Sequence, residues 1–246
     1  MRTDRCLHAV LLAHHLASKR GKALISGKSL VELGAGVGLA GLIASDFATK
    51  VLLSDGNDSV VNLLKKNASA YISSGHVTKP GNERLQHSVQ ENSCISVQKF
   101  VWGDRTELLK ILHDFGSVDV VIAADVVQWP AVVEPLLHTV KALLWESVDE
   151  KPMFLLGLVQ RAQSTSQEFF DLAKRLGFAW EKVDYAKFLP GGVLPDSCKE
   201  HGGRITEIFE IRLIDRSDPP ILLDESADDD CDSTLGKNYQ HSALPC

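Results

Sequence analysis

Residues 30–41 read LVELGAGVGLAG, and this stretch decides the fold. A short apolar run leads into a turn in which every second residue is glycine, and a helix-forming run follows. Such a strand–turn–helix unit leaves bare backbone at the carboxyl end of a strand, where open α/β sheets bind nucleotide-like ligands. The next apolar run ends at Asp55, whose carboxylate is well placed to accept hydrogen bonds from a ribose. The sequence therefore predicts half of a cofactor site.

The spacing of the glycines distinguishes between cofactors. Gly34, Gly36 and Gly38 form G-x-G-x-G, whereas a dinucleotide fingerprint has a small residue at the position that Leu39 holds here. Glu32 precedes the turn, and a pyrophosphate needs no carboxylate there, because a helix N-terminus already supplies positive charge. S-adenosylmethionine carries an ammonium group and a sulfonium, which acidic residues suit better. We expect this cofactor; an ordinary tight turn and a nicotinamide site are the alternatives.

The composition is that of a soluble globular protein. The chain has 246 residues, of which 44% are hydrophobic and 24% charged. Residues 215–246 hold eight of the 32 acidic residues and two of the 26 basic ones, so the first 214 residues are neutral overall. We expect one folded domain over residues 1–214 and an acidic, disordered tail over residues 215–246. No basic surface for nucleic acid is expected.

The cysteines and the apolar runs limit the compartment. Five cysteines are scattered without a C-x-x-C pair, which argues against disulfides and zinc and favours a reducing compartment. The histidines show no metal-ligand spacing, and no run approaches the roughly 20 apolar residues that cross a bilayer. We expect a monomer in the cytoplasm, or also in the nucleus, that binds no metal and no membrane.

Strands and helices alternate along most of the chain, which predicts a parallel sheet with right-handed crossovers. The opening residues 6–17 are expected to form an amphipathic helix with Leu7, Val10, Leu11 and His14 on one face. Residues 72–93 are polar and predict a long surface loop. The expected strands are 29–33, 50–54, 95–101, 118–124 and 153–159, and the expected later helices are 39–48, 58–71, 106–113, 132–147 and 164–176.

The last part of the domain departs from this alternation. Residues 179–184 and 205–213 are extended runs separated by a Gly- and Pro-rich loop, which predicts an antiparallel hairpin with the last strand at the edge of the sheet. The predicted fold class is therefore α/β: a three-layer, doubly wound, mostly parallel seven-stranded sheet of Rossmann-like type, with an antiparallel C-terminal edge hairpin.

Several motifs at these strand ends resemble the seven-strand, class I, S-adenosylmethionine-dependent methyltransferases. More narrowly, the chain resembles the family-16 protein lysine methyltransferases over about residues 6–213. The resemblance implies transfer of methyl groups to a lysine of a protein substrate whose identity the sequence does not give. The matching segments are 31–41, Leu53-Ser54-Asp55-Gly56-Asn57, Asn67, Trp102-Gly103-Asp104 and Ala123-Ala124-Asp125-Val126-Val127.

The resemblance also implies roles for individual residues. Glu32 and the turn from Gly34 through Ala35 and Gly36 to Gly38 are expected to hold the methionine part of the cofactor, and Asp55 its ribose. Trp102 is expected to lie along the adenine and Ala124 beneath the sulfonium. Asp125 opens the family's D-x-x-Y motif and, together with Gln128, is the expected catalytic group that orients the acceptor amine.

Two of these residues have structural alternatives, and two features depart from the family. Trp102 could be an ordinary core aromatic, and Asp125 could cap the following helix. The motif tyrosine is replaced by Gln128, with Trp129 as its neighbour. The chain also begins almost inside the family's first conserved helix, so a shortened N-terminal part is expected. A cofactor-binding protein that acts through a partner without turnover, and a small-molecule methyltransferase, therefore remain alternatives.

Overall fold

The computed structural model describes residues 7–75, 94–195 and 206–221. Its seven strands are β1 (Ser29–Leu33), β2 (Lys50–Asp55), β3 (Ile95–Lys99), β4 (Val120–Ala124), β5 (Met153–Val159), β6 (Phe178–Lys182) and β7 (Thr206–Leu213). They form one sheet in the order β3-β2-β1-β4-β5-β7-β6, in which β1 to β5 are parallel. The parallel strands therefore end at one common edge, and the predicted fold class is confirmed.

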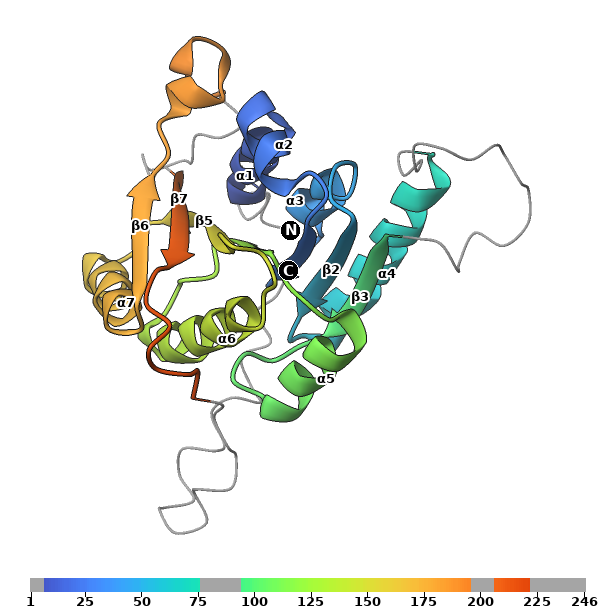
Figure 1. Cartoon of the computed structure of the whole chain (residues 1–246). Helices are drawn as coiled ribbons and strands as arrows, with labels where there is room; N and C mark the ends of the chain where they lie inside the picture. Colours follow the sequence, from blue (N-terminus) through green and yellow to red (C-terminus); the bar gives the residue numbers. More distant parts are fainter. Residues whose placement is uncertain (1–6, 76–93, 196–205, 222–246) are drawn as a thin grey trace.

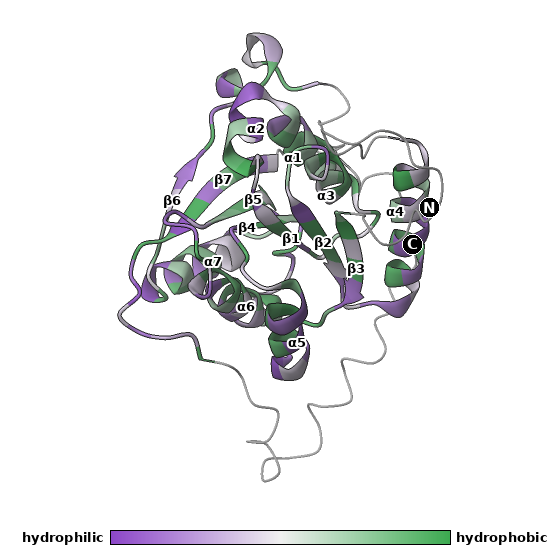
Figure 2. Cartoon of the chain, turned by 45° about the vertical axis from the view of Figure 1, so that its right-hand side comes forward, coloured by the Kyte–Doolittle hydropathy of each residue, from purple (hydrophilic) through white to green (hydrophobic). Residues whose placement is uncertain are grey.

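Helices cover both faces of the sheet (Figure 1). One face carries α1 (Leu7–Ala17), α2 (Lys19–Ile25), α3 (Leu39–Ala44) and α4 (Asp58–Ser73), and the other carries α5 (Arg105–Phe115), α6 (Val133–Trp145) and α7 (Gln163–Arg175). The 3₁₀ turns are η2 (Pro130–Val132), η3 (Tyr185–Lys187) and η4 (Pro190–Gly192). Hydrophobic and hydrophilic residues alternate around α4 and α5 (Figure 2), as surface helices require when they pack on a core.

The central strands are buried on both faces, which is why their sequences are apolar almost throughout. All seven residues of β5 are buried, and in β4 only Ala124 is partly accessible. Two hydrophobic cores result, one on each side of the sheet: Val121 and Phe154 belong to the core beneath α5, α6 and α7, and Ile122 and Leu155 to the core beneath α1 and α3. These cores hold the strand ends in fixed positions.

The C-terminal hairpin is antiparallel as predicted, but the expectation that the last strand lies at the edge is wrong. β7 lies between β5 and β6, and β6 forms the edge. The burial of the two strands explains the order. β7 sends Ile208 into one core and Phe209 and Ile211 into the other, whereas Glu181 and Lys182 of β6 are exposed. The more apolar strand therefore occupies the interior position.

The N-terminal helices differ from expectation in two respects. His14 is exposed, so its predicted place on the apolar face of α1 is wrong; His15, next along the helix, is completely buried. The helix α2 was not predicted. It begins after its N-cap Ser18, whose hydroxyl accepts the Gly21 N–H at 3.1 Å. Arg20 of α2 donates to the buried carboxylate of Glu210 on β7 at 2.6 Å, so α2 is fastened to the sheet.

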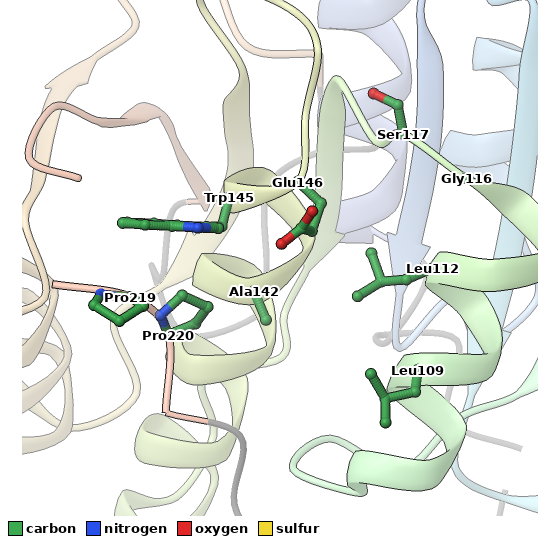
Figure 3. A pocket seen from close by; sticks show the side chains of 9 residues that line it. All are labelled: Leu109, Leu112, Gly116, Ser117, Ala142, Trp145, Glu146, Pro219 and Pro220. Atoms are coloured by element: carbon green, nitrogen blue, oxygen red, sulfur yellow. The ribbon is translucent and has the colours of Figure 1, made fainter. Parts of the chain in front are cut away.

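Two predicted segments lie outside the described residues. The first is most of the expected surface loop: α4 continues to Ser73, and residues 76–93 are outside the described ranges. The second is the expected acidic tail beyond residue 221, and the division of the chain at residue 215 stays a prediction. The described end of the chain passes beside α6, where Pro219 and Pro220 line a hollow together with Trp145 (Figure 3).

The burial of His15 leads to a prediction about stability. Neither of its ring nitrogens has a hydrogen-bond partner among the described residues. Its ring packs edge-on against that of Phe188, with 4.9 Å between the ring centroids. Burial, helped by Arg20, lowers the pKa of His15 from 6.5 to about 4. Between these two values the unfolded chain takes up a proton that the folded protein does not, so stability falls as the pH falls. His15→Leu should remove about 1–3 kcal/mol of this acid destabilisation.

Denaturant unfolding at pH 7.5, 5.5 and 4.5 measures the effect. The exposed neighbour His14 supplies the control, since His14→Leu should leave the pH dependence unchanged. An equal pH dependence in wild type and His15→Leu would show that His15 does not titrate in this way.

Candidate functional site

The site begins with the glycine turn between β1 and α3. Gly34, Gly36 and Gly38 all have positive φ, at 63°, 56° and 83°, a conformation that L side chains rarely adopt. Space is short as well: a Cβ at Gly34 would lie 3.1 Å from the ring of Trp102, and one at Gly38 would lie 2.5 Å from Leu64. Glycine is therefore required at these positions, and the turn presents bare backbone to the space beyond it.

Glu32 lies beneath this turn. Its side chain is only 2% exposed, and its Oε2 accepts the backbone N–H of Gly41 at 2.9 Å. A Cβ at Gly41 would lie 2.4 Å from that oxygen, so the contact needs glycine there as well. Burial raises the pKa of Glu32 to about 8, the Gly41 bond opposes the shift, and nearby Asp55 adds to it. The carboxyl is thus largely protonated at neutral pH in the protein without cofactor.

Asp55 ends β2 beside the turn, as the sequence predicted. Its Oδ2 accepts the Gly36 N–H at 3.2 Å, and its Oδ1 accepts the Asn57 N–H at 3.0 Å. Asn67 of α4 holds the turn from another side, because its amide donates to the Val37 carbonyl at 2.9 Å. The carboxylate and the glycine backbone are thus parts of one braced unit.

A cavity of about 690 Å³ opens beside this unit, a volume suited to a nucleoside-sized ligand. It lies at the carboxyl ends of β1, β2, β3 and β4, where the topology places a ligand site. Seven of the ten predicted site residues line it: Gly34, Gly36, Asp55, Trp102, Ala124, Asp125 and Gln128.

The other three predicted residues lie behind the cavity wall. Glu32 is beneath the turn, and Ala35 is buried with its N–H bonded to the Ser54 carbonyl at 2.8 Å. Gly38 is the N-cap of α3. These residues shape the turn from behind, and direct cofactor contact for them stays a prediction.

Trp102 lines the cavity and also packs against the core. The edge of its ring lies close to Gly34, and its body meets the apolar cluster beneath α5 and α6. The next residue, Gly103, donates its N–H to Thr139 of α6 at 3.0 Å, which fixes the segment after β3. Trp102 is therefore partly a core aromatic and also lines the cavity, and its contact with adenine stays a prediction.

Asp125 is held at all three of its polar groups. Its N–H donates to the Gly157 carbonyl at 2.9 Å, and its carbonyl accepts the Gln128 side-chain amide at 2.7 Å. Its carboxylate accepts Arg161 Nε at 3.0 Å and Nη2 at 2.5 Å. Asp125 caps no helix, because the next helical segment begins at Pro130 with Trp129 as its N-cap. The alternative of a capping role is therefore wrong.

Arg161 is the site residue that the sequence reasoning missed. It follows β5 by two residues, and the ends of β4 and β5 are neighbours in the sheet. Its place after a strand end was the available signal. Arg161 does not itself line the cavity, and the lining residues that were not predicted as site residues include Asn57, Ser59, Val60, Leu63, Phe100, Val101 and Val132.

Two kinds of site are not found within the described ranges. No group of three or more His, Cys, Asp or Glu side chains there could hold a metal ion. No helix there is long and apolar enough to span a membrane.

The sheet order and the glycine-floored cavity with its strand-end carboxylates define a Rossmann-like protein of the methyltransferase class. The chain belongs to the lysine methyltransferase family, whose model matches residues 6–176. The solved structure of magnesium protoporphyrin IX methyltransferase from Synechocystis PCC 6803 has the same fold, with a TM-score of 0.54 at 11% identity. That likeness covers 85% of this chain and 81% of the other.

Curated relatives agree with the family assignment. The chain is 29% identical over 140 residues to the protein N-lysine methyltransferase METTL21A of Danio rerio. The matched segment covers 53% of this chain and 51% of the relative. It is also 29% identical over 178 residues to the protein N-terminal and lysine N-methyltransferase EFM7 of Yarrowia lipolytica. This matched segment covers 70% of this chain and 63% of the relative. The matches thus span less than two thirds of either relative.

The buried carboxyl of Glu32 leads to a prediction about stability. Its pKa is raised from 4.5 to about 8, so the folded protein keeps a proton that the unfolded chain releases between these values. Stability should therefore fall as the pH rises through this range, by at most about 5 kcal/mol. Glu32→Gln keeps an acceptor oxygen for the Gly41 N–H and should remove this loss, which makes the cofactor-free protein more stable at pH 8.

Urea unfolding of the cofactor-free protein between pH 5 and 9 measures the effect. The control is Glu168→Gln, at an exposed position of α7. If Glu32→Gln were no more stable than wild type at pH 8, the carboxyl would be ionised without cost in the folded protein.

Proposed function

We propose that this protein transfers a methyl group from S-adenosylmethionine to a lysine side chain of a protein substrate. The observation that carries the proposal is the cavity at the carboxyl ends of β1, β2 and β4, floored by positive-φ glycines and flanked by Asp55 and Asp125. Family membership supports it, since the family is that of the lysine methyltransferases.

The residues present fit this cofactor. Asp55 is a carboxylate at the cavity wall, suited to ribose hydroxyls, and Trp102 offers a flat apolar surface suited to adenine. Glu32 lies under the turn, where its ionised form would favour an ammonium group. When bound, S-adenosylmethionine supplies an electrophilic methyl group on a sulfonium.

The protein's contribution to methyl transfer is positioning, because the reaction is an in-line displacement without a covalent enzyme intermediate. The acceptor nitrogen and the methyl carbon must be held in line in a dry pocket. A lysine amine has a reference pKa of ~10.4 and must lose its proton first, which desolvation favours. Asp125 and Gln128 line the cavity after the end of β4, and we call this part of the cavity the acceptor side. These two residues would orient the amine.

A second candidate function is cofactor binding without turnover, with action through a partner. One observation favours it: the carboxylate and the carbonyl of Asp125 already accept hydrogen bonds from Arg161 and Gln128. Gln128 also stands where the family motif has tyrosine. We keep this candidate as the alternative outcome of the test below.

We further propose that the protein acts as a monomer in the cytoplasm or the nucleus, on a protein rather than on nucleic acid. Residues 1–214 have no net charge, which argues against nucleic acid as the substrate. The scattered cysteines favour a reducing compartment. Size-exclusion chromatography with light scattering tests the monomer.

Methyl transfer is tested by incubating the protein with labelled S-adenosylmethionine and cell extract. We expect label in a polypeptide that gains increments of ~14 Da at a lysine, as one CH₂ per transfer requires, located by mass spectrometry. Calorimetry with S-adenosylhomocysteine runs in parallel. Heat of binding without any labelled protein would support the second candidate, and neither heat nor label would overturn both.

The role of Asp55 yields a further prediction. Asp55→Ala removes the charged acceptor proposed for the ribose, and charge-assisted hydrogen bonds contribute about 1.5–3 kcal/mol. S-adenosylhomocysteine should therefore bind about 10- to 100-fold more weakly by calorimetry. Asp58→Ala is the matched control, because Asp58 is exposed and pairs with Lys99 outside the cavity. Equal affinities of the two variants, with normal melting of both, would remove Asp55 from the site.

A further inference from the structure

The pairing of Asp125 with Arg161 determines the charge on the acceptor side of the cavity. The Asp125 side chain is 8% exposed and that of Arg161 is 28% exposed. The guanidinium meets both carboxylate oxygens, which is the two-pronged geometry of strong arginine–carboxylate pairs. Asp125 lines the cavity, whereas Arg161 is not among the residues that line it. Arg161 therefore reaches the cavity lining through its hydrogen bonds to Asp125.

The backbone shows how firmly Asp125 is held. Its φ of 56° is the one positive φ outside glycine in the described part of the chain. This conformation costs roughly 1 kcal/mol for a residue other than glycine and persists only where the surroundings impose it. The bonds to Gly157, Gln128 and Arg161 supply that constraint. The carboxylate thus points to Arg161 from an enforced backbone position.

The remaining charges around the cavity are few. The ionisable side chains among its described lining residues are those of Asp55 and Asp125. Asp55 already accepts the N–H groups of Gly36 and Asn57 on the cofactor side, and Glu32 lies behind the wall. Asp125 with its partner Arg161 is therefore the charged pair nearest to the acceptor side.

Methyl transfer to lysine makes this pairing consequential. The protonated amine has no lone pair to attack with, so the bound lysine must be neutral. An unpaired carboxylate beside the nitrogen would stabilise the ammonium form and hold it unreactive. A carboxylate paired with a guanidinium exerts less net negative charge than an unpaired one, while its oxygens remain acceptors and not donors, which suits an N–H of the neutral amine.

We propose that Arg161 is a positioning residue for methyl transfer, which neutralises Asp125 and fixes its carboxylate so that the acceptor lysine is bound as the neutral amine. This inference rests on the proposed lysine methyltransferase function and adds to it a residue and a charge mechanism.

The test is the pH dependence of kcat and KM in Arg161→Gln. Loss of the guanidinium removes a positive charge from beside Asp125, and a carboxylate within a few ångströms raises an amine's pKa by about one unit or more. The acid limb of kcat should therefore move up by about one pH unit, and kcat at pH 7.5 should fall about 10-fold. KM should fall as well, because the protonated lysine that dominates in solution now binds better. A purely structural role would instead raise KM and leave the acid limb in place, and that result would overturn the proposal.

Three further variants complete the test. Asp125→Asn removes a negative charge and keeps the guanidinium, so its acid limb should move down and its KM should rise. The double variant Asp125→Asn with Arg161→Gln removes both charges of the pair and should return the acid limb towards that of wild type. Arg175→Gln, at an exposed position of α7, removes one positive charge away from the site and should change neither value. If Arg161→Gln does not fold, the opposite shift in Asp125→Asn decides, and its absence overturns the proposal.

A binding measurement separates this proposal from the proposed function. With S-adenosylhomocysteine present at pH 7, n-butylammonium should bind Arg161→Gln about 10-fold more tightly than wild type, followed by NMR, because the exposed carboxylate attracts the cation. n-Butanol, its neutral analogue, should bind both equally. If wild type transfers no methyl group, the proposed function fails, and tighter butylammonium binding still supports the charge mechanism. Methyl transfer by wild type with unchanged butylammonium binding and an unmoved acid limb would overturn the proposal alone.

Discussion

The hydrogen bond between the buried Glu32 carboxyl and the N–H of Gly41 is the contact on which the site depends. It joins the end of β1 to the first turn of α3 across the intervening loop, and it sets the path that the loop must take. That path requires positive φ at three glycines and leaves no room for a Cβ at Gly41. The exposed backbone beside the cavity is a consequence of this constraint, since only glycine satisfies it.

The parallel sheet brings the rest of the site to the same edge. β1, β2 and β4 are neighbours in the sheet and end together. The glycine turn, Asp55 and Asp125 therefore converge, although Asp125 lies 91 positions after Gly34 in the sequence. β5 adds Arg161 from the next position in the sheet. The sides of the cavity that we propose for cofactor and acceptor thus come from different pairs of strands, and the crossover helices determine how these pairs are spaced.

Local patterns were enough to predict most of the fold and the cofactor half of the site. The glycine spacing, Glu32 and Asp55 lie within one strand–helix–strand unit, where chain direction alone decides their proximity. The helix α2 was missed because it depends on Arg20 meeting Glu210, 190 residues away. The burial of His15 instead of His14 depends on the loop that carries Phe188. Neither partner can be recognised from the periodicity of the segment itself.

Arg161 illustrates the limit of motif reasoning most directly. The motif predicted that Asp125 orients the acceptor amine, but it gave no sign of a partner for the carboxylate. The pairing with Arg161 depends on the segments after β4 and β5 lying side by side, which only the structure shows. The three acidic residues near the cavity have different environments. Burial raises the pKa of Glu32 so that it keeps its proton, Asp55 accepts two backbone N–H groups, and Asp125 is paired with a guanidinium. A cationic cofactor would convert Glu32 to its ionised form, because it favours the charged state of a nearby carboxyl. Negative charge would then develop on the cofactor side while the acceptor side stays neutral. That asymmetry suits a reaction in which a positive methyl donor must be held and a lysine must arrive without its proton.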